Sequence, residues 1–152
     1  MNVYFANGEG KSPLFVTAGN GHGDVVGLLL AMEGVQVNKA DNSGMAPPVW
    51  VAASGGHGDV VGLLLAMERV QVNKASKSGQ TPLSCAADQG HGDVVDLLLA
   101  MEGEQVNKAE DVYGRTPLWI AAWKGHGDVV GVLLAHEGIQ VNKAPTRHLR
   151  AA

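Results

Sequence analysis

The hexapeptide GHGDVV occurs four times in this chain, at residues 21–26, 56–61, 90–95 and 125–130. The copies are 34 or 35 residues apart, and their flanks match as well: VVGLLLAMEGVQVNKA in the first copy becomes VVGLLLAMERVQVNKA, VVDLLLAMEGEQVNKA and VVGVLLAHEGIQVNKA in the others. A fixed period of this length indicates stacked structural repeats, each too small to bury its own apolar face. The sequence therefore predicts one structural unit that fills the chain four times.

Composition limits the kind of protein. With 152 residues, of which 45% are apolar and 17% charged, the chain is long enough for one globular domain with an ordinary core. The formal net charge of −4 argues against a nucleic-acid partner, which would require a clustered basic face. The lone Cys85 indicates a reducing compartment, and the sequence shows neither a leader nor a membrane span. We therefore expect an intracellular, cytoplasmic protein, with the nucleus left open.

Each unit begins with a glycine-containing turn and a short first helix. Ser12, Thr81 and Thr116 each precede a proline, which predicts a helix start because the hydroxyl caps free N–H groups and proline fits the first helical position. Pro47 occupies the capping position of the second unit, so its helix should start less firmly. The first glycine of GHGDVV should end each first helix.

A second helix follows from GDVV. Its apolar residues cover an arc too wide for one contact, so we expect it to be buried on two sides by neighbouring repeats. In the first unit they are Val25, Val26, Leu28, Leu29 and Leu30. Glycines inside these helices, Gly27, Gly62 and Gly131, each cost about 0.5–1 kcal/mol relative to alanine. We therefore expect modest stability.

The segment SKSGQTPLSCAADQGHGDVVDLLLAMEGEQVN, residues 76–107, resembles the ankyrin repeat, and the resemblance extends over residues 6–143. It implies an all-α repeat fold, an ankyrin-type solenoid of stacked helix-turn-helix units with projecting hairpin-like loops and a concave face. The expected single domain covers residues 1–152, with repeats at about 6–39, 40–74, 75–108 and 109–143 and a tail at 144–152. We call these repeats one to four.

The last unit keeps its full apolar set, although solenoids need terminal repeats with a polar outer face. Either the chain comes from a longer array, or the end faces pair with another molecule. Both alternatives remain open at this stage.

Catalytic and metal sites are not expected. Equivalent histidines on stacked repeats lie about 8–10 Å apart and cannot share one zinc ion; the resemblance implies that His22, His57, His91 and His126 make loop hydrogen bonds instead. The segment at residues 5–12, FANGEGKS, resembles a phosphate loop but lacks its first glycine and aligns with the other repeat loops. Cys85 should be a small buried residue. We predict no enzyme, no catalytic or metal residues and no cofactor.

The residues that break the repeat pattern are the candidates for recognition. In ankyrin proteins the loops and first helices line the concave face, and Trp, Tyr and Arg dominate binding hot spots. The candidate partner-binding residues are Trp50, Tyr113, Arg115, Trp119, Trp123 and Lys124. Packing between repeats is the alternative for Trp50 and Trp119. Trp123 is the best candidate for exposure, because its equivalents are Gly19, Ser54 and Asp88.

These observations favour a protein–protein interaction module that binds a partner protein, of unknown identity, through the concave face. One alternative is a regulatory or targeting segment of a larger protein, possibly an enzyme. The other is a self-associating structural array. We expect a monomer that binds neither nucleic acid nor membrane, with end-to-end self-association left open.

Overall fold

The computed structural model describes residues 6–41, 46–101, 106–109 and 113–142. In these residues the chain forms eight helices in four consecutive pairs. They are α1 (Pro13–Gly19), α2 (Gly23–Leu30), α3 (Pro48–Ser54), α4 (Gly58–Leu65), α5 (Pro82–Gln89), α6 (Gly92–Met101), α7 (Pro117–Lys124) and α8 (Gly127–Leu134).

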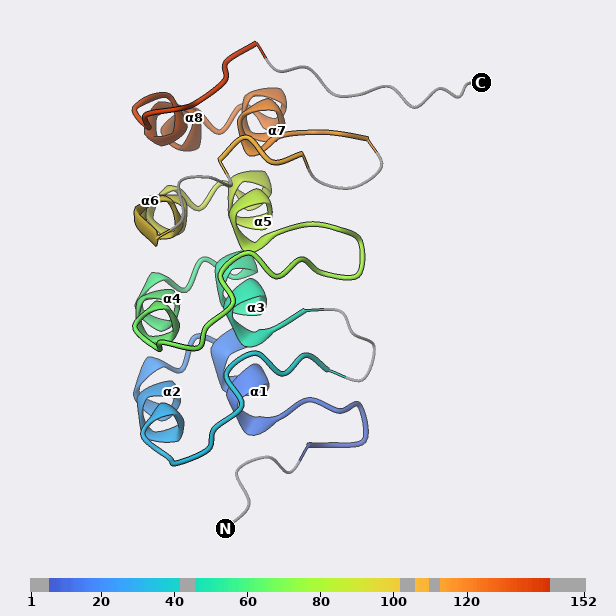
Figure 1. Ribbon diagram of the computed structural model, residues 1–152, viewed down its shortest axis with the longest axis vertical. Helices are drawn as coiled ribbons and strands as arrows, with labels where there is room; N and C mark the ends of the chain where they lie inside the picture. The colour runs from blue at the N-terminus through green and yellow to red at the C-terminus, as the bar shows by residue number, and fades with distance from the viewer. Residues whose placement is uncertain (1–5, 42–45, 102–105, 110–112, 143–152) are drawn as a thin grey trace.

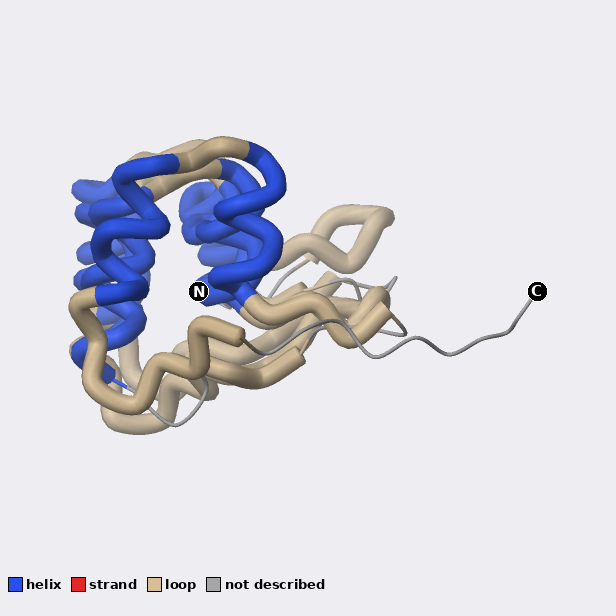
Figure 2. The backbone as a smooth tube through the Cα atoms, turned by 90° about the horizontal axis from the view of Figure 1, so that it is seen from above, coloured by secondary structure: helices blue, strands red, loops and turns tan. Residues whose placement is uncertain are grey.

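The pairs stack on one another along the long axis of the molecule. Figure 1 shows the first helices α1, α3, α5 and α7 in one column and the second helices in the other, with the loops projecting beside the first column. Viewed along the stack, the two columns form two layers, and the loops extend away from them (Figure 2). The all-α solenoid of stacked helix-turn-helix units predicted from the sequence is confirmed.

The first helices begin where the hydroxyl–proline pairs predict. Ser12, Thr81 and Thr116 each accept a hydrogen bond from the backbone N–H three residues further on, at 3.1–3.2 Å. Pro47, at the same position of α3, provides no side-chain cap. Side-chain capping therefore marks three of these four helix starts, and a proline at the beginning of the helix is common to all four.

The core lies between successive repeats. Val60 and Val61, adjacent in α4, are both completely buried, as are Val94 and Val95 in α6. Neighbouring residues of a helix point in directions about 100° apart, so one helix contact cannot cover both. The prediction that inner second helices are buried on two sides is confirmed.

Histidines connect each repeat to the one before it. The Nε2 atoms of His57, His91 and His126 form hydrogen bonds with main-chain carbonyl oxygens of the preceding repeat at 2.9–3.1 Å, those of Gly19, Ser54 and Asp88 respectively. The predicted loop hydrogen bonds are thus confirmed for three of the four histidines. In repeat one the side chain of His22 is exposed.

The first glycine of GHGDVV has two reasons to be glycine wherever a further repeat packs against it. Gly56 has a φ of +73°, in the left-handed region that side chains with a Cβ rarely adopt. A Cβ on Gly56 would also lie 2.6 Å from the ring of His91. The tight turn and the close approach of the next repeat therefore require the same residue.

A second set of hydrogen bonds joins the loops that follow the second helices. Asn38 donates from Nδ2 to the carbonyl of Arg69 at 2.7 Å and accepts from the backbone N–H of Gln71 at 2.8 Å. Asn107 makes the same pair of bonds to the carbonyl of Gly138 and the N–H of Gln140, at 2.6 and 2.8 Å. Each such asparagine connects its repeat to the following one.

The mid-helix glycines lead to a stability prediction. A Cβ at Gly62 would meet no atom within 4 Å, so Gly62→Ala should raise the free energy of unfolding by about 0.5–1 kcal/mol through the helix propensity of alanine alone. Gly56→Ala is the matched control and should destabilise the protein, because of its positive φ and the ring of His91. Urea unfolding followed by circular dichroism measures both; a less stable Gly62→Ala protein would contradict the prediction.

Candidate functional site

Two tryptophans form a stacked pair on α7. The rings of Trp119 and Trp123 have centroids 5.6 Å apart and an interplanar angle of 28°. Their separation of four residues places them on the same face of the helix. Trp119 is half-buried, whereas 66% of the Trp123 surface is exposed. A large apolar ring is therefore held in a fixed orientation and presented to solvent.

The loop before α7 contributes a second pair. The guanidinium carbon of Arg115 lies 4.9 Å from the centroid of the Tyr113 ring, a cation–π arrangement. Tyr113 is exposed and Arg115 is half-buried. Each side chain thus restricts the other.

An ion pair crosses from repeat four to repeat three. Lys124, the last residue of α7, places Nζ 2.6 Å from Oδ1 of Asp88 on α5. Both side chains are partly exposed, so the pair adds little to stability. The ion pair instead fixes the position of the Lys124 side chain, because it holds the lysine against the preceding repeat.

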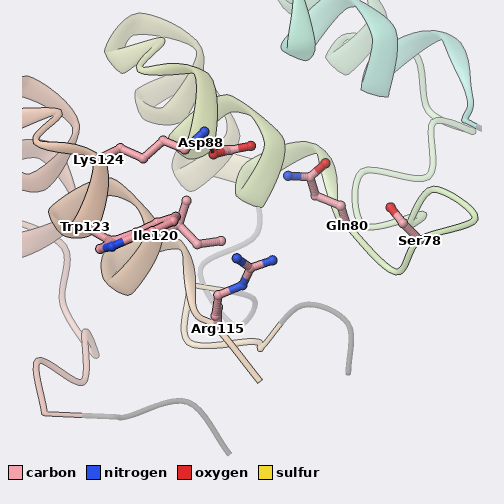
Figure 3. A pocket seen from close by; sticks show the side chains of 7 residues that line it. All are labelled: Ser78, Gln80, Asp88, Arg115, Ile120, Trp123 and Lys124. Carbon is pink, nitrogen blue, oxygen red and sulfur yellow. Dashed lines mark ion pairs between the residues drawn. The ribbon is translucent and has the colours of Figure 1, made fainter. Parts of the chain in front are cut away.

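These side chains surround a polar pocket of about 300 Å³ between repeats three and four. Figure 3 shows its lining: Ser78, Gln80, Asp88, Arg115, Ile120, Trp123 and Lys124. The lining holds two cationic groups and one carboxylate, so its formal charge is net positive. The sequence does not single out Asp88 or Gln80 as site residues, because no sequence pattern pairs them with residues about 35 positions away.

Trp50 lies apart from this cluster. It is half-buried, and its Nε1 donates to the carbonyl of Gln80 in the loop of repeat three at 2.8 Å. The same carbonyl accepts from the N–H of Ser76 at 2.8 Å. Trp50 therefore takes part in packing between repeats, and its role as a partner contact stays a prediction.

The loop that resembles a phosphate loop is organised by its own side chains. Asn7 Oδ1 accepts from the N–H groups of Glu9 and Lys11, each at 3.0 Å, and Ser12 caps α1. Lys11 and Glu9 form an ion pair at 2.8 Å; this hydrogen bond and the opposite charges lower the pKa of Glu9 and raise that of Lys11. The described part of the segment behaves as an ordinary repeat loop.

Other candidate chemistry in the sequence has structural explanations. Cys85 is 1% exposed, which confirms it as a small buried residue. Within the described ranges, no three His, Cys, Asp or Glu side chains gather in a way that could hold a metal ion. None of the helices in those ranges combines the length and apolar character needed to cross a bilayer.

Comparison with known families agrees with the fold. The family model described as "Ankyrin repeats (3 copies)" matches residues 1–75 and 49–144. The chain belongs to the ankyrin repeat family, whose members are in general protein-interaction modules. No curated protein matches the chain.

The indole hydrogen bond of Trp50 can be tested against an equivalent residue. Trp50→Phe should lower the free energy of unfolding by about 0.5–1.5 kcal/mol, because the bond from Nε1 to the Gln80 carbonyl is lost. Trp119→Phe is the matched control: it makes the same change at the same helix position of repeat four, where Nε1 forms no hydrogen bond with another described residue. Chemical unfolding would contradict the prediction if the two variants lost equal stability.

Proposed function

We propose that this chain binds a partner protein through the loop and first helix of repeat four. The surface consists of Tyr113, Arg115, Trp119, Trp123 and Lys124, called here the repeat-four cluster. The observation that carries the proposal is the exposed Trp123 ring beside a polar pocket that contains an arginine. Exposed Trp, Tyr and Arg side chains are the types most enriched at binding hot spots.

The cluster is already arranged before binding. Trp123 rests on Trp119, Arg115 lies against Tyr113, and Lys124 is paired with Asp88. A side chain that is restricted in the free protein loses less entropy when a partner immobilises it. Rigid aromatic anchors of this kind favour binding without rearrangement of the backbone.

The charges and shape of the pocket indicate the chemistry of the partner. The lining has two cationic groups, the ammonium of Lys124 and the guanidinium of Arg115. A guanidinium recognises a carboxylate through two parallel hydrogen bonds. We therefore propose a partner segment with an Asp or Glu side chain directed at Arg115 and an apolar side chain on Trp123. The lone, buried Cys85 supports an intracellular setting for this contact.

The position of the surface can be tested by affinity capture from a cell lysate. The double variant Tyr113→Ala, Trp123→Ala should capture at least about tenfold less partner than the unchanged protein, because two aromatic rings of the proposed hot spot are removed. The matched control, Met32→Ala with Met101→Ala, removes two exposed apolar side chains, one just after α2 and one at the end of α6, and should capture the same amount of partner as the unchanged protein. Equal capture by the double variant and the unchanged protein would contradict the proposed surface.

The acidic nature of the partner has its own test. With the captured partner purified, Arg115→Gln should weaken binding more than Lys124→Gln, because a guanidinium holds a carboxylate through two parallel hydrogen bonds whereas an ammonium acts as a point charge. The contribution of Arg115 to the binding affinity should also fall as the salt concentration is raised, since exposed charges are screened. Isothermal titration at two salt concentrations measures both effects. A partner that binds Arg115→Gln as tightly as the unchanged chain would contradict the predicted carboxylate contact.

A further inference from the structure

The first repeat exposes residues that the other repeats bury. Val25 is 38% exposed, whereas its equivalents Val60, Val94 and Val129 are completely buried. The difference arises because each of those three valines has a preceding repeat packed against it, whereas none of the described residues forms a repeat in front of Val25. Together with Val16 (39% exposed) and Leu28 (72% exposed, compared with 38% for Leu63 and 36% for Leu97), Val25 forms a surface that we call the leading end.

The last repeat exposes the opposite side of the same contact. Val141 is 60% exposed, whereas its equivalents Val37 and Val106 are 5% and 2% exposed and Val72 is half-buried. Leu134 is 47% exposed, compared with 7% for Leu99. These residues line an apolar groove of about 500 Å³, the trailing end, which also includes Ala122, Val130 and both tryptophans of α7.

We propose that a second copy of this chain stacks head to tail on the first, with its leading end on the trailing end, in the register of the inner repeats. We infer a second copy as the partner because its leading end would continue the contact that already joins successive repeats. Three times in the chain, one repeat presents the trailing type of surface and the next presents the leading type. The leading end of a second copy is therefore the surface that matches the exposed trailing end.

The glycines provide the first comparison. A Cβ on Gly21, Gly56 or Gly90 would lie 2.5–2.8 Å from a histidine ring of the following repeat. Gly125 occupies the same position with the same positive φ, but nothing lies within 4 Å of its Cβ position. In the proposed stack, the exposed His22 of the second copy fills this space.

A second glycine position gives the same result. Cβ atoms on Gly23, Gly58 and Gly92 would meet an aspartate of the following repeat, at 2.7, 2.9 and 3.1 Å, whereas Gly127 has open space. The aspartates concerned are Asp59, Asp93 and Asp128. Asp24 of the second copy is the equivalent residue. Two neighbouring openings thus match two neighbouring side chains of repeat one.

Hydrogen bonds extend the same register. Asn142 is the repeat-four equivalent of Asn107, which bonds to the carbonyl of Gly138 and the N–H of Gln140. In the stack, the partners of Asn142 are the carbonyl of Gly34 and the N–H of Gln36 in the second copy. Equivalent groups therefore exist on both ends.

The tryptophans on α7 fit this contact as well. Trp119 is equivalent to Trp50, whose Nε1 donates to the carbonyl of Gln80 in the following repeat. The corresponding carbonyl in a second copy is that of Lys11, which accepts from Asn7 N–H just as the Gln80 carbonyl accepts from Ser76 N–H.

Trp123 is where the trailing end differs from the inner repeats. Its equivalent in repeat one is Gly19, where a Cβ would lie 3.7 Å from Val51 of the following repeat. Val16 is the residue of a second copy that corresponds to Val51. The Trp123 ring, folded onto Trp119, therefore adds apolar surface where Val16 arrives.

The symmetry of this contact makes it testable. Each copy uses different surfaces on its two sides, so the contact is heterologous and continues into open chains or rings. Sedimentation velocity over a range of concentrations should show an average mass that rises from 15.8 kDa past twice that value. A single 15.8 kDa species at all concentrations would overturn the proposal, because it would mean that the ends do not pair.

Two single variants separate the ends. Val25→Glu charges the leading end at a position in the first turn of α2 where a carboxylate suits the helix. Val141→Glu charges the trailing end, and Leu134→Glu provides a second variant there. Each should weaken association roughly tenfold or more, because a charge would be buried without a partner. Met101→Glu, an equal change at an exposed inner position, should associate as the unchanged chain does.

The decisive measurement mixes the two variants. Val25→Glu keeps an intact trailing end and Val141→Glu keeps an intact leading end, so the equimolar mixture should form a dimer and stop there. A mixture that stays monomeric overturns the proposal. Association of Val25→Glu alone, as strong as that of the unchanged chain, would also overturn it, since it would indicate a symmetric contact between trailing ends. Circular dichroism of each variant verifies that it is folded.

Discussion

Val60 and Val61 are adjacent in the chain but are buried against opposite neighbours, and this requirement organises the whole structure. The two ends of the array show it: Val25, the equivalent of Val60, is exposed where no repeat precedes it, and Val130, the equivalent of Val61, is half-buried where none follows. A second helix that is apolar on two sides cannot bury both of them within its own repeat. Stacking buries both sides, and it leaves one unmatched side at each end.

The histidine contact explains why the hexapeptide recurs without change. Its first glycine has to adopt a positive φ and leave room for the ring of the next repeat, and its histidine has to reach a carbonyl of the previous one. A substitution in any inner copy therefore disturbs two repeats at once. The equivalents of position 123, which are Gly19, Ser54 and Asp88, contribute only a main-chain carbonyl to this contact, so their side chains can vary.

Recognition and stacking meet at α7. Trp123 lines both the polar pocket on the loop side and the apolar groove at the end of the stack. Arg115 and Lys124 belong to the pocket alone, whereas Leu134 and Val141 belong to the groove alone. The two proposed contacts therefore share an aromatic ridge but differ in their chemistry, one being polar and net positive and the other apolar.

The sequence by itself determined the repeat period, the positions and caps of the first helices, and the burial of the second helices, because glycine, proline and hydroxyl side chains act locally and the apolar pattern follows the helical period. It also singled out Trp123 as exposed. Only the tertiary structure decided that Asp88 pairs with Lys124, and that Trp50 bonds to a neighbouring loop while the equivalent Trp119 stacks on Trp123. These outcomes depend on what the adjacent repeat places against each side chain, and a contact between residues some 30–40 positions apart leaves no local pattern in the chain.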